Sequence, residues 1–335
     1  MHDRVYQTLV ILPRQSQSIA AMINLRVQNG DRVMTTDSFE ATSLGGEPLA
    51  APTFPDDIRA RLEARLTEAR TAYARQPDDA DALLLLAQST GALGRFREAI
   101  ALFGEGMTKH PADARFPRYR GHRLLSTRQL APAIADLTAA AALVAGQAPA
   151  PEYPPGSAKE GVPIYTLQFS IWYHLGLAHY LAGDFASAAP AYAACHAFAQ
   201  TDETLVAVTH WRYMALRRRG DAEDAAHVLA PIHTHMQITE NRPYYRLVLL
   251  YSGAATPEAT LAPDAADVDK GMGNNQALMD ATVGYGVGNW HWYNGRQPEG
   301  EAMFRTILDT TLPGMARFAF GYIAAEADLA RRGRK

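Results

Sequence analysis

The sequence is poor in cysteine, in long apolar runs and in excess charge of either sign. Cys195 is the only cysteine among 335 residues, so an intrachain disulfide is excluded. No apolar run approaches the roughly 18 residues that a membrane helix needs. Lys and Arg together number 32 and Asp and Glu 35, which leaves a net charge of −3. The chain as a whole therefore has no strong positive electrostatic potential that would attract nucleic acid or an anionic membrane.

Motifs of common catalytic and metal sites are also absent. The pattern H-E-x-x-H does not occur, and one cysteine cannot supply a zinc-binding pair. His174 and His179 are five residues apart, so on a helix they project to different sides. The string GYGVGN at 284–289 lacks the preceding strand and the following Lys of a phosphate-binding loop. We predict no metal, no cofactor and no catalytic residue, and we interpret Cys195 as a buried, inert thiol.

A helical pattern that repeats about every 34 residues is what the sequence does contain. In residues 169–198, FSIWYHLGLAHYLAGDFASAAPAYAACHAF, apolar residues recur at helical spacing on both sides of Gly183. Gly176 and Ala188 are small enough to let two helices approach closely, and Tyr192 fills the space beside them. Residues of the same kinds recur at these places elsewhere: Ala87, Gly94, Ala99 and Phe103; Gly121, Arg128, Ala133 and Leu137; Gly220, Ala225 and Leu229; and Gly295 and Phe304.

This period and pattern resemble the tetratricopeptide repeat (TPR), in which W-x2-L-G-x2-Y, A-x3-F and a closing Pro mark two antiparallel helices. The resemblance covers about residues 55–330 and implies an all-α, right-handed superhelical solenoid of TPR-like helical hairpins. The strings IWYHLGLAHYL, THWRYMALRR and ATVGYGVGNWHWYNG are similar to an uncharacterised bacterial family of TPR proteins, usually exported or lipid-anchored. The first 40 residues carry no export signal, which predicts a cytoplasmic protein, whereas the family resemblance implies export.

The repeat also predicts how the chain is organised. Residues 1–54 are expected to be an N-terminal extension that is partly disordered, and 55–335 the solenoid. Irregular insertions near 146–166 and 256–276 interrupt the repeat, and 314–333 is expected to be a capping helix with a polar end.

The TPR resemblance places function on the first helix of each unit, on the face that lines the inner groove. Core packing needs no cations there, so we predict a protein-protein interaction scaffold without catalysis, whose partner presents acidic and apolar groups. The alternatives are that these residues are merely solvated, or that the chain is an enzyme or small-ligand receptor with a site between the last and fourth repeats. The basic run 217–219 is expected at the C-terminal end of a helix, where positive charge is favourable. We therefore predict that the chain does not bind nucleic acid. The groove positions are Arg118, His122, Tyr173, Leu177, Tyr180, His210, Met214, Arg217, Tyr285, Asn289 and Trp292.

Overall fold

The computed structural model describes residues 39–152, 165–262, 275–310 and 314–333. The chain divides into two units, Met1–Phe39 and Glu40–Lys335, and every described residue except Phe39 belongs to the second. The described part is mostly helical, so the predicted all-α fold class is confirmed. Its elements, in chain order, are β1 (Phe39–Thr42), β2 (Pro48–Ala50), α2 (Asp56–Arg75), α3 (Ala80–Ala92), α4 (Phe96–Lys109), α5 (Arg115–Ser126), α6 (Leu130–Leu143), β3 (Pro151–Glu152), β4 (Tyr165–Thr166), α7 (Leu167–Ala182), α8 (Phe185–His196), α9 (Asp202–Arg219), α10 (Ala222–Val228), α11 (Arg242–Tyr251), α12 (Pro257–Leu261), α13 (Asn275–Tyr293), α14 (Gln297–Asp309), the 3-10 helix η4 (Gly314–Phe318) and α15 (Phe320–Arg332).

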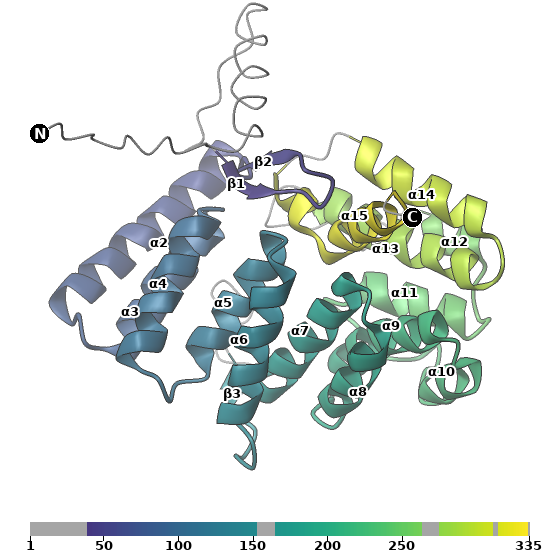
Figure 1. Ribbon diagram of the computed structural model, residues 1–335, viewed down its shortest axis with the longest axis horizontal. Helices are drawn as coiled ribbons and strands as arrows, with labels where there is room; N and C mark the ends of the chain where they lie inside the picture. Colours follow the sequence, from purple (N-terminus) through teal and green to yellow (C-terminus); the bar gives the residue numbers. More distant parts are fainter. Residues whose placement is uncertain (1–38, 153–164, 263–274, 311–313, 334–335) are drawn as a thin grey trace, which may run out of the picture. The chain divides into compact units, whose positions relative to one another are not determined.

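Helical hairpins stacked in chain order make up the solenoid (Figure 1). Within the hairpins α3 packs on α4, α5 on α6, α7 on α8, and α13 on α14. Successive hairpins also touch, because α4 contacts α5, α6 contacts α7 and α8 contacts α9. The first helices α3, α5, α7 and α9 contact one another in turn and form the inner layer of the stack.

The turn inside each hairpin has the same backbone conformation. The residue that ends the turn has a positive φ in every unit, a conformation that glycine adopts without the steric penalty of a Cβ. Arg128 takes this place in the second unit at φ 63°, and its side chain has a separate role described below. The glycines at this place are Gly94, Gly183, Gly220 and Gly295.

The small residues of the repeat lie where two helices cross. A Cβ at Gly176 on α7 would lie 2.8 Å from the ring of Tyr192 on α8. The same contact, between residues 16 positions apart, joins Gly121 to Leu137 and Gly288 to Phe304. The residues that recur at fixed spacing in the sequence are therefore the ones that meet where the two helices of a hairpin cross. Cys195 is fully buried, as predicted, and its Sγ lies 3.4 Å from the carbonyl oxygen of Phe169.

Residues 40–54 pack against the helices. Leu49 on β2 is buried, and the backbone N–H of Arg97 donates to Glu40 at 2.9 Å. Residues 1–38 of the expected N-terminal extension lie outside the described residues, so its partial disorder stays a prediction. In the insertion near 146–166, β3 and β4 form a short antiparallel pair in which Glu152 lies opposite Tyr165; residues 153–164 lie outside the described part, as do 263–274 of the second insertion.

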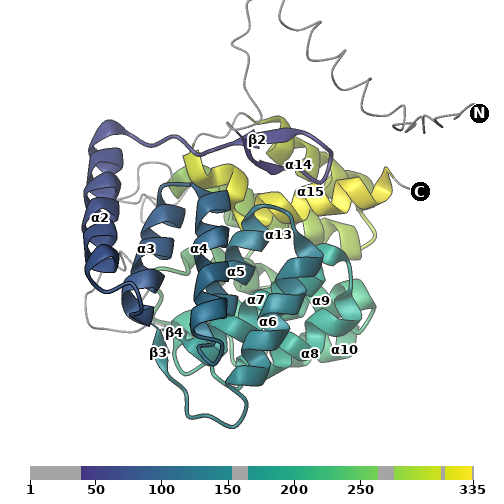
Figure 2. The ribbon, with the colours of Figure 1, turned by 60° about the vertical axis from the view of Figure 1, so that its left-hand side comes forward.

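The C-terminal helices return to the inner layer of the stack. Helix α11 packs on α9, α13 packs on α11 and α9, and α15 packs on α13 and α7. Figure 2 shows the helices from α2 to α10 following one another across the stack, with α14 and α15 along its upper edge. The stretch 314–333, expected to be a capping helix with a polar end, holds η4 followed by α15, in which residues 321–328 are all buried and 332–333 are exposed. This helix covers other helices because its small residues, such as Gly321 beside the backbone of α13, allow close contact.

Buried ion pairs fix this return. The guanidinium of Arg218 on α9 lies 2.7 Å from Asp328 on α15, whose other oxygen accepts a hydrogen bond from Tyr285 at 2.9 Å. Arg128 lies 2.9 Å from Glu326 and also donates to the carbonyl oxygen of Arg317. Burial alone would raise the pKa of Asp328, but Arg218 and Arg331 outweigh it and lower that pKa below its usual value. None of the described helices is long and apolar enough to cross a membrane.

Candidate functional site

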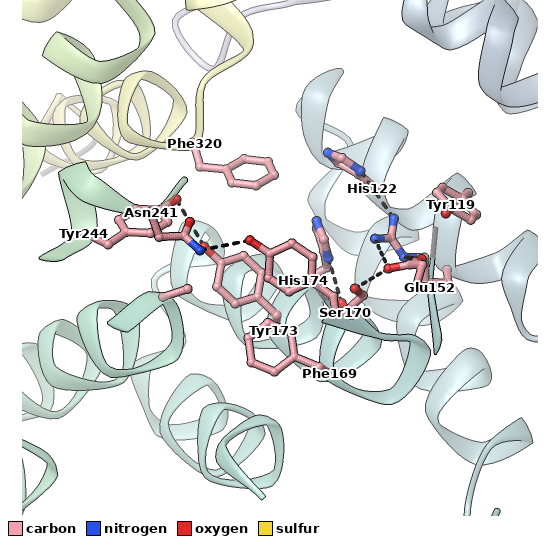
Figure 3. Close-up of a pocket in the computed structure, with 13 residues that line it drawn as sticks. Tyr119, His122, Glu152, Phe169, Ser170, Tyr173, His174, Asn241, Tyr244 and Phe320 are labelled. Atoms are coloured by element: carbon pink, nitrogen blue, oxygen red, sulfur yellow. Dashed lines mark hydrogen bonds and ion pairs between the residues drawn. The ribbon is translucent and has the colours of Figure 1, made fainter. Parts of the chain in front are cut away.

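A cavity of about 290 Å³ opens on the inner layer between α5, α7 and α11 (Figure 3). The β3–β4 pair borders one side of it, and Phe320 at the start of α15 borders another. Its walls combine a polar end, formed by α5, α7 and Glu152, with a set of aromatic rings. The lining includes Arg118, Tyr119, His122, Glu152, Tyr165, Phe169, Ser170, Tyr173, His174, Ala207, Asn241, Tyr244 and Phe320.

The polar end is built around a buried ion pair. Arg118 Nε lies 2.8 Å from Glu152 Oε1 and Arg118 Nη2 lies 3.0 Å from Glu152 Oε2, with both side chains about 5% exposed. Ser170 on α7 also donates to Glu152. The guanidinium of Arg118 lies over the ring of Tyr119, 4.2 Å from its centre. The insertion therefore supplies the carboxylate that a cation on α5 requires, and this charge pair leaves the polar end neutral.

Two histidines face each other beside this pair. The rings of His122 on α5 and His174 on α7 lie 4.5 Å apart, and Phe320 lies near both. His174 Nδ1 lies 2.7 Å from the carbonyl oxygen of Ser170, so it carries the proton and Nε2 is left as an acceptor. Burial lowers the pKa of His174, as does the charge of Arg118. Burial likewise lowers the pKa of His122, followed by Arg123, so both rings are neutral at pH 7.

A column of stacked rings forms the aromatic wall. Tyr165, Phe169 and Tyr173 are four residues apart, which places them in one row as α7 begins. Their ring centres are 5.4 Å and 5.8 Å apart with nearly parallel planes. Opposite them, the hydroxyl of Tyr173 donates to that of Tyr244 at 3.2 Å, and Asn241 donates to the Tyr165 hydroxyl at 3.0 Å. This wall offers flat apolar area with a few fixed polar groups, the composition typical of ligand sites.

A second, smaller cavity of about 120 Å³ adjoins the first on the inner layer. Gln88 and Gly91 on α3 line it, together with Tyr119 and Arg123 on α5. Tyr119 lines both cavities, so the two hollows lie on either side of one side chain. The hollowed part of the inner layer thus extends from α3 across α5 to α7 and α11.

The groove residues predicted from the sequence fall into three groups. Arg118, His122 and Tyr173 meet at the cavity. Arg217 and Trp292 are partly exposed, with Arg217 donating to Asn294 at 3.0 Å and Trp292 stacked under Arg332 at 4.5 Å. The third group is fully buried, because the returning C-terminal helices cover the face expected to line a groove: Leu177, Tyr180, His210, Met214, Tyr285 and Asn289.

The junction of the fourth and last repeats, where we expected a site if the chain were an enzyme or receptor, is packed core. Trp211 and Tyr285 stack there, and Tyr180 meets both rings edge-on. Asn289 donates to the Tyr180 hydroxyl at 2.9 Å and accepts from Arg218 at 3.0 Å. The side chains of Asn289, Tyr180 and Arg218 are therefore hydrogen-bonded to one another within the core. The cavity lies instead at the second and third repeats.

Several cavity residues were not found by sequence reasoning. Ser170 and His174 share a face of α7 at a spacing of four, a signal that helical periodicity could have supplied. Glu152 lies in an irregular insertion whose path the repeat does not predict. Asn241, Tyr244 and Phe320 reach the cavity through tertiary contacts of α11 and α15, which no local pattern encodes.

Comparison with known proteins adds little to this geometry. No model of a known protein family matches the sequence, and no curated protein does. A chain in a solved structure titled "Structure of Naa15/Naa10 bound to HypK-THB" matches 80% of this chain, with 17% identical residues and a TM-score of 0.34. The aligned region spans 39% of that longer chain. A likeness of this size transfers neither partners nor activity, and membership of the bacterial TPR family stays a prediction.

Proposed function

We propose that the chain is a non-catalytic binding protein that takes an extended segment of a protein partner along the inner layer of α3, α5 and α7. The observation that supports this most is the adjacency of two cavities that share Tyr119. Two hollows separated by one side chain suit an extended ligand that places successive groups in each. Aromatic rings dominate the larger hollow, and rings of this kind contribute much of the binding energy in protein interfaces.

A selection from a displayed random peptide library tests this proposal. Peptides enriched on the wild type are synthesised, and their affinities are measured by calorimetry. The blocking variant is Ala207→Leu, since Ala207 on α9 lines the larger cavity and is 2% exposed. Three added carbon atoms occupy the cavity, and we expect at least a tenfold loss of affinity, about 1.4 kcal/mol.

The matched control is Ala139→Leu, which adds the same atoms at an exposed position of α6. It should bind the peptides as the wild type does. Equal affinity for the wild type and Ala207→Leu would place the binding site elsewhere. A selection that enriches no peptide would contradict segment binding altogether.

A small-ligand receptor is the second candidate, favoured by the size of the larger cavity. Its volume of about 290 Å³ is close to the lower end of the range for small-molecule sites. A fragment screen by thermal shift separates this candidate from the first. Fragments that raise the melting temperature of the wild type and of Ala139→Leu, but not of Ala207→Leu, would favour the receptor.

A further inference from the structure

Arg123 differs from the other buried or half-buried arginines around it in its charge balance. On α5, Arg118 pairs with Glu152, and Arg120 lies 2.6 Å from Asp136. Arg128, at the turn after α5, pairs with Glu326. Arg123 forms no ion pair with any carboxylate of the described residues. Its guanidinium contacts the two ring nitrogens of His122 at 3.0 Å and 2.9 Å and faces the ring of Phe96.

The surroundings of Arg123 make this charge costly to hold. Burial and, after it, the nearby charge of Arg118 together lower the pKa of Arg123 to about 10. The guanidinium remains protonated at pH 7, because that value is well above neutral. A half-buried cation without a counter-charge is stabilised when an anion binds beside it.

Among the charged groups of the described residues that line the two cavities, only one lacks an opposite charge, and an anion would bind beside it. Glu152 is already neutralised by Arg118, and the pKa values of His122 and His174 keep both rings uncharged. The titratable charges that line the two hollows are therefore two arginines and one carboxylate. Arg123 carries the excess positive charge, at the edge of the smaller hollow.

The larger hollow is lined by His122, which contacts Arg123, and its other walls favour a flat group. Tyr165, Phe169 and Tyr173 present a continuous stack on one side, while Tyr244 and Phe320 border the other sides (Figure 3). Aromatic pairs gain contact energy beyond the area that they bury. The Nε2 acceptor of His174 and the hydroxyls of Tyr173 and Tyr244 can in addition bond a polar substituent on the ring.

Building on the proposed binding function, we propose that the group anchored here is an aromatic ring with a carboxylate close to it. The ring occupies the larger hollow and the carboxylate pairs with Arg123. In a protein segment this chemistry is an aromatic residue next to Asp or Glu. In a free ligand it is a small aromatic acid.

Matched probes test the carboxylate. From a peptide enriched on the wild type, versions are made that carry Asp or Asn beside the aromatic residue, and one in which Ala replaces the aromatic residue. The small-molecule probes are 4-hydroxyphenylacetate and its neutral amide. We expect the wild type to bind the Asp peptide at least tenfold more tightly than the Asn peptide. Replacing the aromatic residue by Ala should lower the affinity at least tenfold.

Variants of Arg123 locate the effect. Arg123→Gln should bind the Asp and Asn peptides equally, whereas Arg123→Lys should keep a preference for Asp. Arg59→Gln removes an exposed cation on α2 and should behave as the wild type does. A melting temperature measured for each variant separates lost binding from lost folding.

The outcomes separate the two proposals. Equal affinity of the wild type for Asp and Asn peptides would overturn the carboxylate inference while leaving segment binding in place. A preference for Asp that persists in Arg123→Gln would overturn the role of Arg123. Binding of the free acid over its amide, with no peptide bound, would support the carboxylate and replace the protein segment by a small ligand. If neither the peptides nor the acid binds, both proposals fail.

Discussion

The inner layer of the stack is hollow over α3, α5 and the start of α7 but closed over the end of α7 and α9. Both regions follow the same repeat, with a residue of positive φ at the turn of each hairpin and glycines at the crossings of α5, α7 and α13. The two regions differ in the helices that pack over them. Helices α11, α13 and α15 fill the second region, whereas the first keeps two cavities. Helix α7 itself thus forms a wall of the cavity at Tyr173 and packed core at Tyr180, seven residues later.

The largest effect is expected where the closed region depends on one carboxylate. Asp328 accepts hydrogen bonds from Arg218, Arg331 and Tyr285 and is almost fully buried. Asp328→Asn leaves Arg218 with no carboxylate partner there, so we expect a loss of about 3–5 kcal/mol in unfolding free energy. Urea unfolding at pH 7 measures it. Asp309→Asn, at an exposed position, should change stability by less than about 0.5 kcal/mol.

A smaller loss is expected from the corresponding change in the hollow region. Glu152 balances one arginine and accepts from Ser170, and Glu152→Gln keeps the shape while removing the charge. We expect unfolding free energy to fall by about 2 kcal/mol, since a hydrogen bond to a charged group is worth about 1.5–3 kcal/mol. If Glu152→Gln proved as damaging as Asp328→Asn, the hollow region would be as tightly coupled to the fold as the closed one.

Glycine substitutions should affect the two regions equally, because the hairpins themselves are alike. A Cβ at Gly121 would lie 2.6 Å from Leu137, and one at Gly288 would lie 2.9 Å from Phe304. We expect Gly121→Ala and Gly288→Ala each to cost about 2 kcal/mol through overpacking. Thermal melts measure both, and Gly45→Ala, in an exposed turn with only ordinary contacts, is the control. A difference above about 1 kcal/mol would show that the crossings are not equivalent.

Acid should weaken the closed region through His210. This ring lies between Tyr244 and Tyr251, and burial lowers the pKa of His210 to about 3. Because the unfolded chain binds a proton near pH 6.5 and the folded chain does not, stability is complete above that pH and falls toward pH 3.

We expect the free energy of unfolding to fall by about 1 kcal/mol for each pH unit below pH 6. The measurement is the slope of unfolding free energy against pH. His210→Gln removes the titration of His210 but leaves those of His122 and His174. The slope of unfolding free energy against pH should therefore be about 1 kcal/mol per pH unit shallower in this variant than in the wild type. Identical slopes would mean that water reaches His210 in the folded protein.

Sequence reasoning predicted the contacts within hairpins and not those between distant helices. The turn at Gly183 and the crossing of Gly176 with Tyr192 follow from spacing, because both are set by residues a few turns apart. The burial of Tyr180 and Asn289 follows from α13 and α15 folding back, which depends on pairs such as Arg218 with Asp328. Of the cavity, Arg118, His122 and Tyr173 could be predicted from helix faces. Glu152 and Asn241 could not, since irregular segments position them.

The pairing of Arg128 with Glu326 affects how the protein unfolds. It joins residues 198 positions apart, and Arg218 with Asp328 joins residues 110 apart. In an open repeat array each unit touches only its neighbours, so units can melt one after another from the ends. Here the last helix is tied to the second and fourth hairpins, and loss of any of the three weakens the others. We therefore expect the chain to melt in one cooperative step, and the stack to reach its full stability only once α15 is in place.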